Sequence, residues 1–299
     1  MSRYLVTGGS GRLGRSVVAV LAEAGHDVVS VDRVPHDPEG ARGIACDLSD
    51  PVSTTALFAE HRPDAVVHLA AIAVPFGRPD AELYATNTQL AFTVLEAALS
   101  SGVPSVLLAS SPTVIGYGGP DGWAPSYLPL DEQHALAPWN AYALSKQAVE
   151  QIAAMIVRAH VHRIRVGSFR PCYVIAPEEW AGAPTQQGHT VLDRLTHPEL
   201  SAVSLFNYVD ARDVGDFVLA WIARAGEIPN GSVFFVGAPD SLAREPVADM
   251  LARHRPELTS AAAGLREDAA LFSSDHARDL LGWTASRSWR TELALNDVS

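Results

Sequence analysis

The stretch Thr7-Gly8-Gly9-Ser10-Gly11-Arg12-Leu13-Gly14 decides the fold of this chain. It follows a short strand-like run and opens a helical pattern that extends from Leu13 to Ala24. Gly8 permits a tight turn, Gly11 lets a pyrophosphate approach the backbone, and Gly14 lets the helix pack closely on the strand. The free N–H groups at the start of that helix would then face the phosphates. The stretch predicts a dinucleotide-binding turn, and the alternative is an ordinary glycine-rich strand-to-helix connection.

Short apolar strands alternate with helical stretches on both sides of this turn. The strands are nearly continuous in Val, Leu and Ile, which is typical of a parallel sheet buried on both faces. The alternation predicts an α/β fold with a doubly wound parallel sheet, the Rossmann arrangement. The expected strands are Tyr4–Thr7, Asp27–Val31, Arg42–Cys46, Ala65–Leu69, Ser105–Ala109 and Arg163–Ser168, and the expected helices are Leu13–Ala24, Val52–His61, Ala81–Leu99 and Ala141–Ala159.

The alternation stops after Arg170, where the chain becomes rich in loops and prolines. Val209 to Ala225 is helical again after a short strand, and a further strand is expected at Ser232 to Val236. The segment Gly116 to Asn140 has no clear period and reads as a long loop, which in a compact domain is more often functional than idle. The expected division is a dinucleotide-binding domain at residues 1–170, with 203–226 returning to it, and a smaller C-terminal substrate-binding lobe at 171–202 and 227–299.

Composition excludes several classes of partner. The chain has 299 residues, is 47% hydrophobic and carries a formal net charge of -12 with no basic run, which argues against nucleic acid and anionic membranes. Cys46 and Cys172 form neither a disulfide framework nor a metal-binding spacing. No signal-peptide pattern precedes the first strand, and no apolar run approaches the ~20 residues of a membrane span. We expect a soluble cytoplasmic protein without a bound metal.

Two carboxylates follow strand ends and bear on the cofactor. Asp32 ends the second expected strand, where a carboxylate accepts hydrogen bonds from the adenosine ribose and repels a 2′-phosphate. This favours NAD; NADP is the less favoured alternative, because Arg33 offers a 2′-phosphate a partner. Asp47 and Leu48 follow the third strand, where a carboxylate would face the adenine amino group. The alternative for Asp47 is a place in the helix cap before Pro51.

The chain contains one lysine, Lys146, and it follows Tyr142 by one helical turn. Lysine carries a compact ammonium on a flexible stem, whereas arginine carries a planar fork that keeps its proton. Side chains one turn apart share a helix face. An ammonium there favours the phenolate and lowers the phenol pKa from its ordinary value of ~10. The pair therefore predicts a tyrosine acid/base, and a solvated helix lysine is the alternative.

These residues resemble a known family, the extended short-chain dehydrogenases/reductases of the NAD-dependent epimerase/dehydratase group. The resemblance covers about the first 175 residues in the family's order and continues in two later segments. Its motifs are Thr7 to Gly14, Asp32, Asp47-Leu48, His68-Leu69-Ala70-Ala71, Asn87, Ser110-Ser111, Tyr142 to Lys146, Arg170-Pro171, Tyr208-Val209-Asp210 with Asp213-Val214, and Leu281-Gly282-Trp283.

The resemblance implies a catalytic set. Tyr142 would be the acid/base, Lys146 would tune it and hold the nicotinamide ribose, and Ser111 would hold the substrate oxygen. Ser110 and Thr113 are neighbours that would share or take that role, and capping of a strand end is the alternative for these hydroxyl groups.

The resemblance also implies binding residues. Tyr173 is a candidate substrate contact, and Asn87 would tie a strand end to a helix. The expected cofactor site is Gly8, Gly11, Arg12, Leu13, Gly14, Asp32, Arg33, Asp47, Leu48, Leu69, Ala70, Ala71, Asn87, Lys146 and Pro171.

Two departures from the family bear on the reaction. Family dehydratases carry an acidic pair after the active-site threonine, whereas Pro112-Thr113-Val114 has no carboxylate, which argues against dehydration. Members that act on nucleotide sugars tend to carry an arginine just before the Tyr208 segment. This chain has Ser204-Leu205-Phe206-Asn207 there, so a diphosphate would lack a cationic partner.

We therefore expect an NAD-dependent oxidoreductase that transfers a hydride at a secondary hydroxyl or ketone of a sugar-like or polyol-like small molecule. The nearest alternative is an NAD-dependent sugar or nucleotide-sugar epimerase that uses the same residues. A dinucleotide-binding regulator is the alternative from another class, and the intact serine, tyrosine and lysine set argues against it. By resemblance we also expect a homodimer through the two long helices Ala81–Leu99 and Ala141–Ala159.

Overall fold

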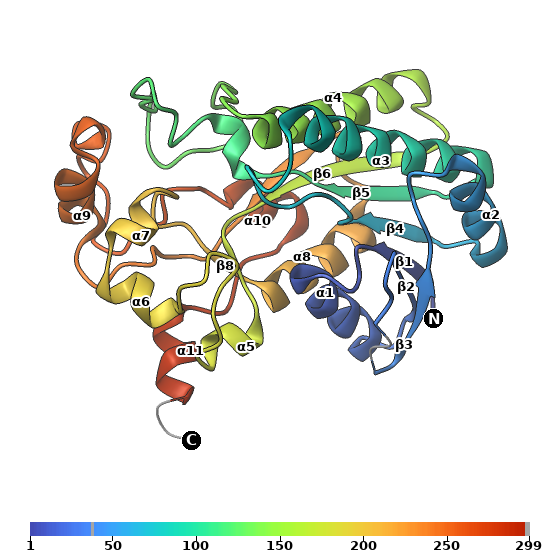
Figure 1. The fold of residues 1–299 in the computed structure, drawn as a ribbon, viewed down its shortest axis with the longest axis horizontal. Helices are drawn as coiled ribbons and strands as arrows, with labels where there is room; N and C mark the ends of the chain where they lie inside the picture. Colours follow the sequence, from blue (N-terminus) through green and yellow to red (C-terminus); the bar gives the residue numbers. More distant parts are fainter. Residues whose placement is uncertain (37–38, 297–299) are drawn as a thin grey trace.

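The computed structural model describes residues 1–36 and 39–296. Its centre is a seven-stranded sheet in the order β3-β2-β1-β4-β5-β6-β9, and every neighbouring pair is parallel (Figure 1). The order reverses between β1 and β4, and in open α/β sheets ligands bind outside the carboxyl ends of the strands at such a point. The strands are β1 (Arg3–Thr7), β2 (Asp27–Asp32), β3 (Ala41–Ala45), β4 (Ala65–His68), β5 (Ser105–Ala109), β6 (Arg165–Pro171) and β9 (Val233–Val236).

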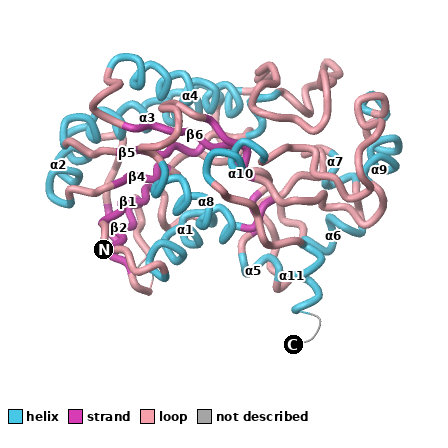
Figure 2. Tube along the Cα trace, turned by 180° about the vertical axis from the view of Figure 1, so that it is seen from behind, coloured by secondary structure: helices cyan, strands magenta, loops and turns pink. Residues whose placement is uncertain are grey.

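Helices cover both faces of this sheet (Figure 1; Figure 2 shows the reverse side). One face packs on α2 (Pro51–His61), α3 (Asp80–Ser101) and α4 (Ala141–Ala159), and the other on α1 (Arg12–Glu23), α8 (Ala211–Arg224) and α10 (Asp275–Leu281). Neighbouring strand residues go to opposite faces: Leu5 packs with the first group and Val6 with the second. The predicted doubly wound fold is confirmed. Within the described ranges no helix is both long and apolar enough to cross a membrane.

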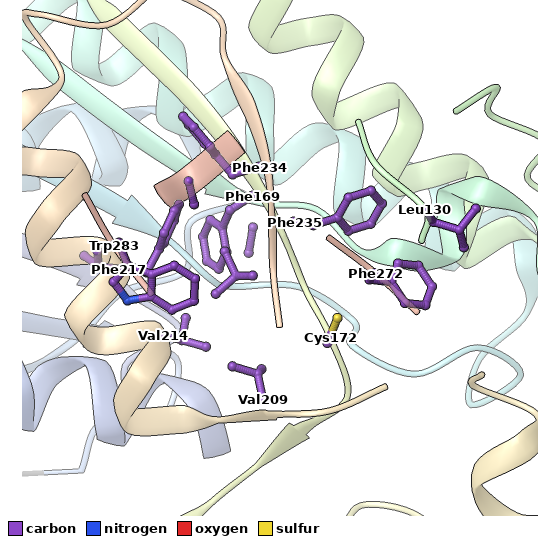
Figure 3. Close-up of a cluster of buried hydrophobic side chains, with 14 of the residues drawn as sticks. Leu130, Phe169, Cys172, Val209, Val214, Phe217, Phe234, Phe235, Phe272 and Trp283 are labelled. Carbon is purple, nitrogen blue, oxygen red and sulfur yellow. The ribbon is translucent and has the colours of Figure 1, made fainter. Parts of the chain in front are cut away.

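An aromatic cluster packs between α8 and the strands β6 and β9 at one edge of the sheet (Figure 3). Phe217 of α8 lies 5.5 Å from Phe169 of β6 and 5.6 Å from Phe234 of β9, between ring centroids. Gly167 of β6 brings α8 close, because a Cβ there would lie 2.5 Å from the Trp221 indole nitrogen. The strand expected within the C-terminal lobe is thus the seventh strand of the main sheet. Placing all of 227–299 in the lobe was wrong for this segment, because its aromatic side chains complete the core.

The smaller lobe lies beyond the carboxyl ends of the strands (Figure 1). The expectation of mostly loop at 171–202 missed three short helices there. Their length of one or two turns leaves no readable period. Thr190 caps α6 by accepting a hydrogen bond from the Asp193 amide. The lobe elements are β7 (Val174–Ile175) paired with β8 (Val209–Asp210), α5 (Pro177–Trp180), α6 (Val191–Thr196), α7 (Glu199–Ala202), α9 (Val247–His254) and α11 (Trp289–Asn296).

The long loop predicted before α4 is confirmed. Between Gly116 and Asn140 the structure contains no α-helix and no strand beyond an isolated bridge from Leu130 to Phe272. The loop is nevertheless anchored to the C-terminal segment, because the Leu130 amide donates to the Leu271 carbonyl at 2.8 Å. It therefore forms a fixed wall beside the start of α4.

Candidate active site

A cavity of about 1320 Å³ opens at the carboxyl ends of β1 and β4. Its walls come from the glycine turn, the ends of the strands, the start of α4 and the lobe. All but one of the predicted site residues line it, namely Gly8, Gly11, Arg12, Leu13, Gly14, Asp32, Arg33, Asp47, Leu48, Leu69, Ala70, Ala71, Ser110, Ser111, Thr113, Tyr142, Lys146, Pro171 and Tyr173.

The glycine turn fits a dinucleotide phosphate. Gly8 adopts φ 69°, and a Cβ there would lie 2.7 Å from the Ala70 backbone nitrogen. A Cβ on Gly14 would lie 2.1 Å from the Gly8 carbonyl oxygen, so this position excludes any side chain. Gly11 caps α1 without a side-chain hydrogen bond, which leaves the first N–H groups of the helix to the cavity. The turn is thus a bare backbone cradle at a helix N-terminus.

The expected adenosine contacts lie along the same wall. Asp32 ends β2 and accepts hydrogen bonds from the Arg33 amide at 2.8 Å and the Ser10 amide at 3.3 Å. Asp47 accepts from the amide and the hydroxyl of Ser49 at 3.0 and 2.7 Å, and these bonds hold its pKa below the ordinary value. Both carboxylates are therefore held as hydrogen-bond acceptors at the cavity edge.

Asn87 is the predicted cofactor residue that does not line the cavity. It is buried in α3, where Oδ1 accepts from the Ile72 amide at 2.8 Å and Nδ2 donates to the Ser145 hydroxyl at 3.0 Å. Asn87 therefore links the loop after β4 to α4 on the side away from the cavity. This is the structural role that the resemblance implies for it.

The structure brings Ser111, Tyr142 and Lys146 together. Tyr142 lies in the first turn of α4, which begins where Asn140 caps the helix by accepting from the Ala143 amide at 2.9 Å. One turn later the buried Lys146 ammonium lies 5.9 Å from the Tyr142 ring centroid and donates to the Ala109 carbonyl at 2.9 Å. The Ser111 side chain caps the turn η1 (Pro112–Ile115), so its position follows from the end of β5.

Burial dominates the ionisation of Tyr142 and Lys146. It raises the pKa of Tyr142, while the hydrogen bond with Ser111 lowers it. Burial also lowers the pKa of Lys146 to about 8, against the carboxylate of Glu150, which raises it. Burial lowers the pKa of the neighbouring His68 to about 3, so His68 is neutral and adds no positive charge beside Lys146.

A buried network that sequence reasoning missed lies behind Lys146. Glu150 accepts from the Ser110 hydroxyl at 2.5 Å and from two guanidinium nitrogens of Arg170 at 2.8 Å each. The Ser110 hydroxyl therefore bonds inside the protein, and Thr113 instead donates to Ser111 at 2.9 Å. The available signal was the spacing, because Glu150 follows Lys146 by one further helical turn on the same face.

This network yields a prediction on pH dependence. Glu150→Gln removes the charge that raises the pKa of Lys146, so the ammonium should lose its proton at lower pH. Since the charged lysine is the form that favours the phenolate, the alkaline fall of kcat/KM should move to lower pH by about one unit. The measurement is a pH profile on variant protein shown to be folded by circular dichroism. An alkaline limb that does not move would contradict this role of Glu150.

Two further aromatic side chains lie at the mouth of the cavity. Phe76, with φ 64°, and Trp139 line the cavity with ring centroids 6.0 Å apart. They come from the loop after β4 and from the long loop, which carry no periodic pattern. Only the fold brings the two loops to one opening.

Comparisons with known proteins agree with this geometry. The model of the NAD dependent epimerase/dehydratase family matches residues 4–237. A UDP-glucose 4-epimerase of Azospirillum brasilense is 32% identical over 166 residues, 53% of this chain and 45% of that protein, so the chain spans about half the length of this relative. A dTDP-6-deoxy-L-talose 4-dehydrogenase (NAD(P)(+)) of Kitasatospora kifunensis is 29% identical over 306 residues, 97% of this chain and 92% of that protein.

Among solved structures, a UDP-glucose 4-epimerase from Brucella ovis in complex with NAD superposes with a TM-score of 0.75. The alignment covers 98% of this chain and 96% of that chain at 18% identity, which shows a shared fold. The family match includes both the glycine turn and the tyrosine–lysine pair, which line the same cavity. This chain belongs to the NAD dependent epimerase/dehydratase family.

Proposed function

We propose that the protein is an NAD-dependent oxidoreductase that transfers a hydride at a secondary hydroxyl or ketone of a sugar-like or polyol-like small molecule. The observation that carries the proposal is one cavity containing both the bare glycine cradle and the Ser111, Tyr142 and Lys146 set. A cavity with a few convergent polar groups is typical of small-molecule sites.

The residues divide the proton chemistry between them. Ser111 holds the substrate oxygen, and the Tyr142 phenolate accepts the hydroxyl proton as the carbonyl forms. The charged form of Lys146, present below a pH of about 8, favours that phenolate. NAD, when bound, supplies the hydride acceptor. In the reverse direction the Tyr142 phenol returns the proton to the same oxygen.

An epimerase is the second candidate, and the relatives support both readings, because one is an epimerase and another a 4-dehydrogenase. Incubating the protein with NAD and a panel of neutral sugars, sugar acids and nucleotide sugars separates the two. Net build-up of NADH, followed by its absorbance, supports the dehydrogenase. Product without net NADH supports the epimerase, and no product from any member of the panel contradicts both.

The choice of cofactor yields a prediction on Asp32. Asp32→Ala removes a carboxylate that accepts from ribose hydroxyls and repels a 2′-phosphate, and it leaves the exposed Arg33 beside the position of that phosphate. We expect the ratio of NAD to NADP affinity to fall about tenfold or more, an effect of ~1.4 kcal/mol. Titration of both cofactors, with Asp27→Ala at the far end of β2 as the control, measures it. An unchanged ratio would remove Asp32 from the adenosine site.

We also propose the setting of the enzyme. Residues 171–202 and the C-terminal segment outside β9 and α10 would form the substrate-binding lobe of a soluble cytoplasmic enzyme without nucleic-acid or membrane partners. A homodimer through α3 and α4 is supported by side chains that these helices leave exposed, Tyr84, Phe92, Leu144 and Met155 at 38%, 39%, 47% and 36%. Such side chains gain by burial against a second copy.

A further inference from the structure

Arg12 of the glycine turn directs its side chain away from the turn and into the smaller lobe. Its Nη2 donates to both carboxylate oxygens of Glu179, at 2.5 and 2.7 Å, and to the Val174 carbonyl at 3.0 Å. Its Nη1 donates to the side-chain carbonyl oxygen of Gln186 at 3.0 Å. These acceptors lie in α5, in β7 and in the loop before α6, so a single guanidinium joins the turn to three segments of the lobe.

The ion pair of Arg12 with Glu179 is largely shielded from solvent. The Glu179 side chain is 3% exposed and the Arg12 side chain 29%. Glu179 also accepts from the Ala176 amide at 2.8 Å, so its carboxylate fixes the start of α5 as well. A buried carboxylate that loses its cation is destabilising, because its charge then lies away from water without a partner. The pair therefore favours one position of α5 against the turn.

A second ion pair joins the same two helices and differs in its exposure. Arg15 of α1 lies 2.7 Å from Glu178 of α5, between Nη2 and Oε1, and the two side chains are 47% and 49% exposed. Exposed pairs contribute little to stability, because water and salt screen them. Of these two contacts between α1 and α5, the shielded one is therefore expected to fix the position of α5.

Arg12 connects two parts of the active-site cavity. Its backbone belongs to the bare start of α1, where the free N–H groups face a dinucleotide phosphate. The chain on either side of α5 lines the cavity, at residues 173–174 before it and 186–187 after it, whereas 175–185 are not part of the lining. The position of α5 therefore influences the lobe wall of the cavity, and Arg12 ties that position to the turn.

We propose that the Arg12–Glu179 ion pair couples the glycine turn to the lobe, so that a dinucleotide bound at the turn also fixes the lobe wall. The inference rests on the proposed function, and it makes Arg12 a positioning residue whose guanidinium holds the lobe while its backbone faces the cofactor. A cofactor that orders the turn lowers the entropy that is lost when the turn and α5 come together. By linkage, ordering of α5 raises the affinity for the cofactor by the same factor.

The test is hydrogen exchange followed by mass spectrometry, with and without saturating NAD. Residues 8–14 report binding at the turn. The segment 177–183, which contains α5, reports transmission to the lobe, because it lies outside the cavity lining and a dinucleotide in the cavity does not contact it directly. Its reporting amides are those of Glu179, Gly182 and Ala183, which are hydrogen-bonded within or beside the segment.

Four variants separate this ion pair from its surroundings. Arg12→Met removes the guanidinium. Arg12→Met combined with Glu179→Gln removes both charges and keeps an acceptor for the Ala176 amide, so no buried carboxylate is left unpaired. Arg12→Lys keeps the charge but not the planar fork that reaches several acceptors. Arg15→Met is the matched control, since it removes the exposed pair between the same two helices.

We expect NAD to slow exchange in the wild type about fivefold or more, both at the turn and at 177–183. In Arg12→Met and in the double variant NAD should still slow exchange at the turn, but by less than about twofold at 177–183. Arg12→Lys should keep part of the effect at 177–183, and Arg15→Met all of it. Calorimetric titration should show that Arg12→Met weakens NAD binding by a factor similar to the protection that it loses, because the coupling is reciprocal.

Three results would overturn the inference: NAD that protects the turn of the wild type but not 177–183, an Arg12→Met variant that keeps the protection at 177–183, or an Arg15→Met variant that loses as much of it. Weaker NAD binding by Arg12→Met with intact protection at 177–183 would assign the guanidinium to the cofactor phosphates instead. If Arg12→Met does not fold, the double variant and Arg12→Lys decide. A wild type in which NAD protects neither segment would refute the dinucleotide site, and with it the proposed function.

Discussion

Tyr142→Phe is expected to lower kcat by about 10²–10⁴-fold while the affinity for NAD stays within a factor of about two. The substitution removes one oxygen from a side chain in the first turn of α4 and leaves the helix cap by Asn140 in place. Without the phenol the set lacks the group assigned to exchange a proton with the substrate oxygen, because Ser111 only holds that oxygen and Lys146 donates to the Ala109 carbonyl. Steady-state kinetics and an NAD titration measure the two quantities.

Tyr127→Phe is the matched control. Tyr127 is 38% exposed in the long loop and donates to Asp131, away from the catalytic set. Removing its hydroxyl should change kcat by less than about twofold, since the lost contact is an exposed one worth ~1 kcal/mol or less in stability. If Tyr142→Phe behaves like this control, the acid/base assignment fails for dehydrogenase and epimerase alike.

Gly14→Ala is expected to weaken NAD binding about 100-fold or more. The added Cβ would lie 2.1 Å from the Gly8 carbonyl oxygen and 2.7 Å from the Gly9 Cα, and both are backbone atoms of the turn. The turn must therefore move, which displaces the N–H groups that face the phosphates. A 100-fold loss corresponds to ~2.7 kcal/mol, within the range of steric strain in a packed region. Titration with NAD, beside a melting curve, measures it.

Gly226→Ala is the control for the methyl group itself, because a Cβ there meets no atom within 4 Å. Should Gly14→Ala fail to fold, Gly11→Ala tests the same cradle more gently, with a Cβ 3.2 Å from the Gly8 oxygen. A Gly14→Ala protein that binds NAD as tightly as the wild type would show that the cofactor does not lie on this turn.

Strand and helix positions in the first 170 residues were predictable to within a few residues, because each depends on a pattern inside its own segment. The glycine turn and the Tyr142–Lys146 pair are equally local: one is a single turn of chain, the other a single turn of helix. The later half was harder to predict. Its helices are as short as four residues, as in α5 and α7, and β9 pairs with β6 although the 61 residues from 172 to 232 separate the two strands.

The absence of arginine between Ser204 and Asn207 shows the limit of such reasoning. From the sequence, this segment lacks a cationic partner for an anion. In the folded protein Arg194 reaches the Ser204 hydroxyl from α6, so a positive charge lies at the segment after all. A sequence motif shows which side chains belong to a segment. The electrostatic potential at that segment depends also on side chains that other parts of the chain bring close to it.

The amino-acid sequence by itself determined the doubly wound sheet, the phosphate turn and the acid/base pair, because periodicity, glycine spacing and helical register act over a few neighbouring residues. Only the tertiary structure decided the neighbours of Lys146, the ion pair of Arg12 with Glu179 and the stacking of Arg194 on the Tyr173 ring. Those features depend on burial and on contacts between segments that are distant in the sequence. Burial and such contacts exist only in the folded protein.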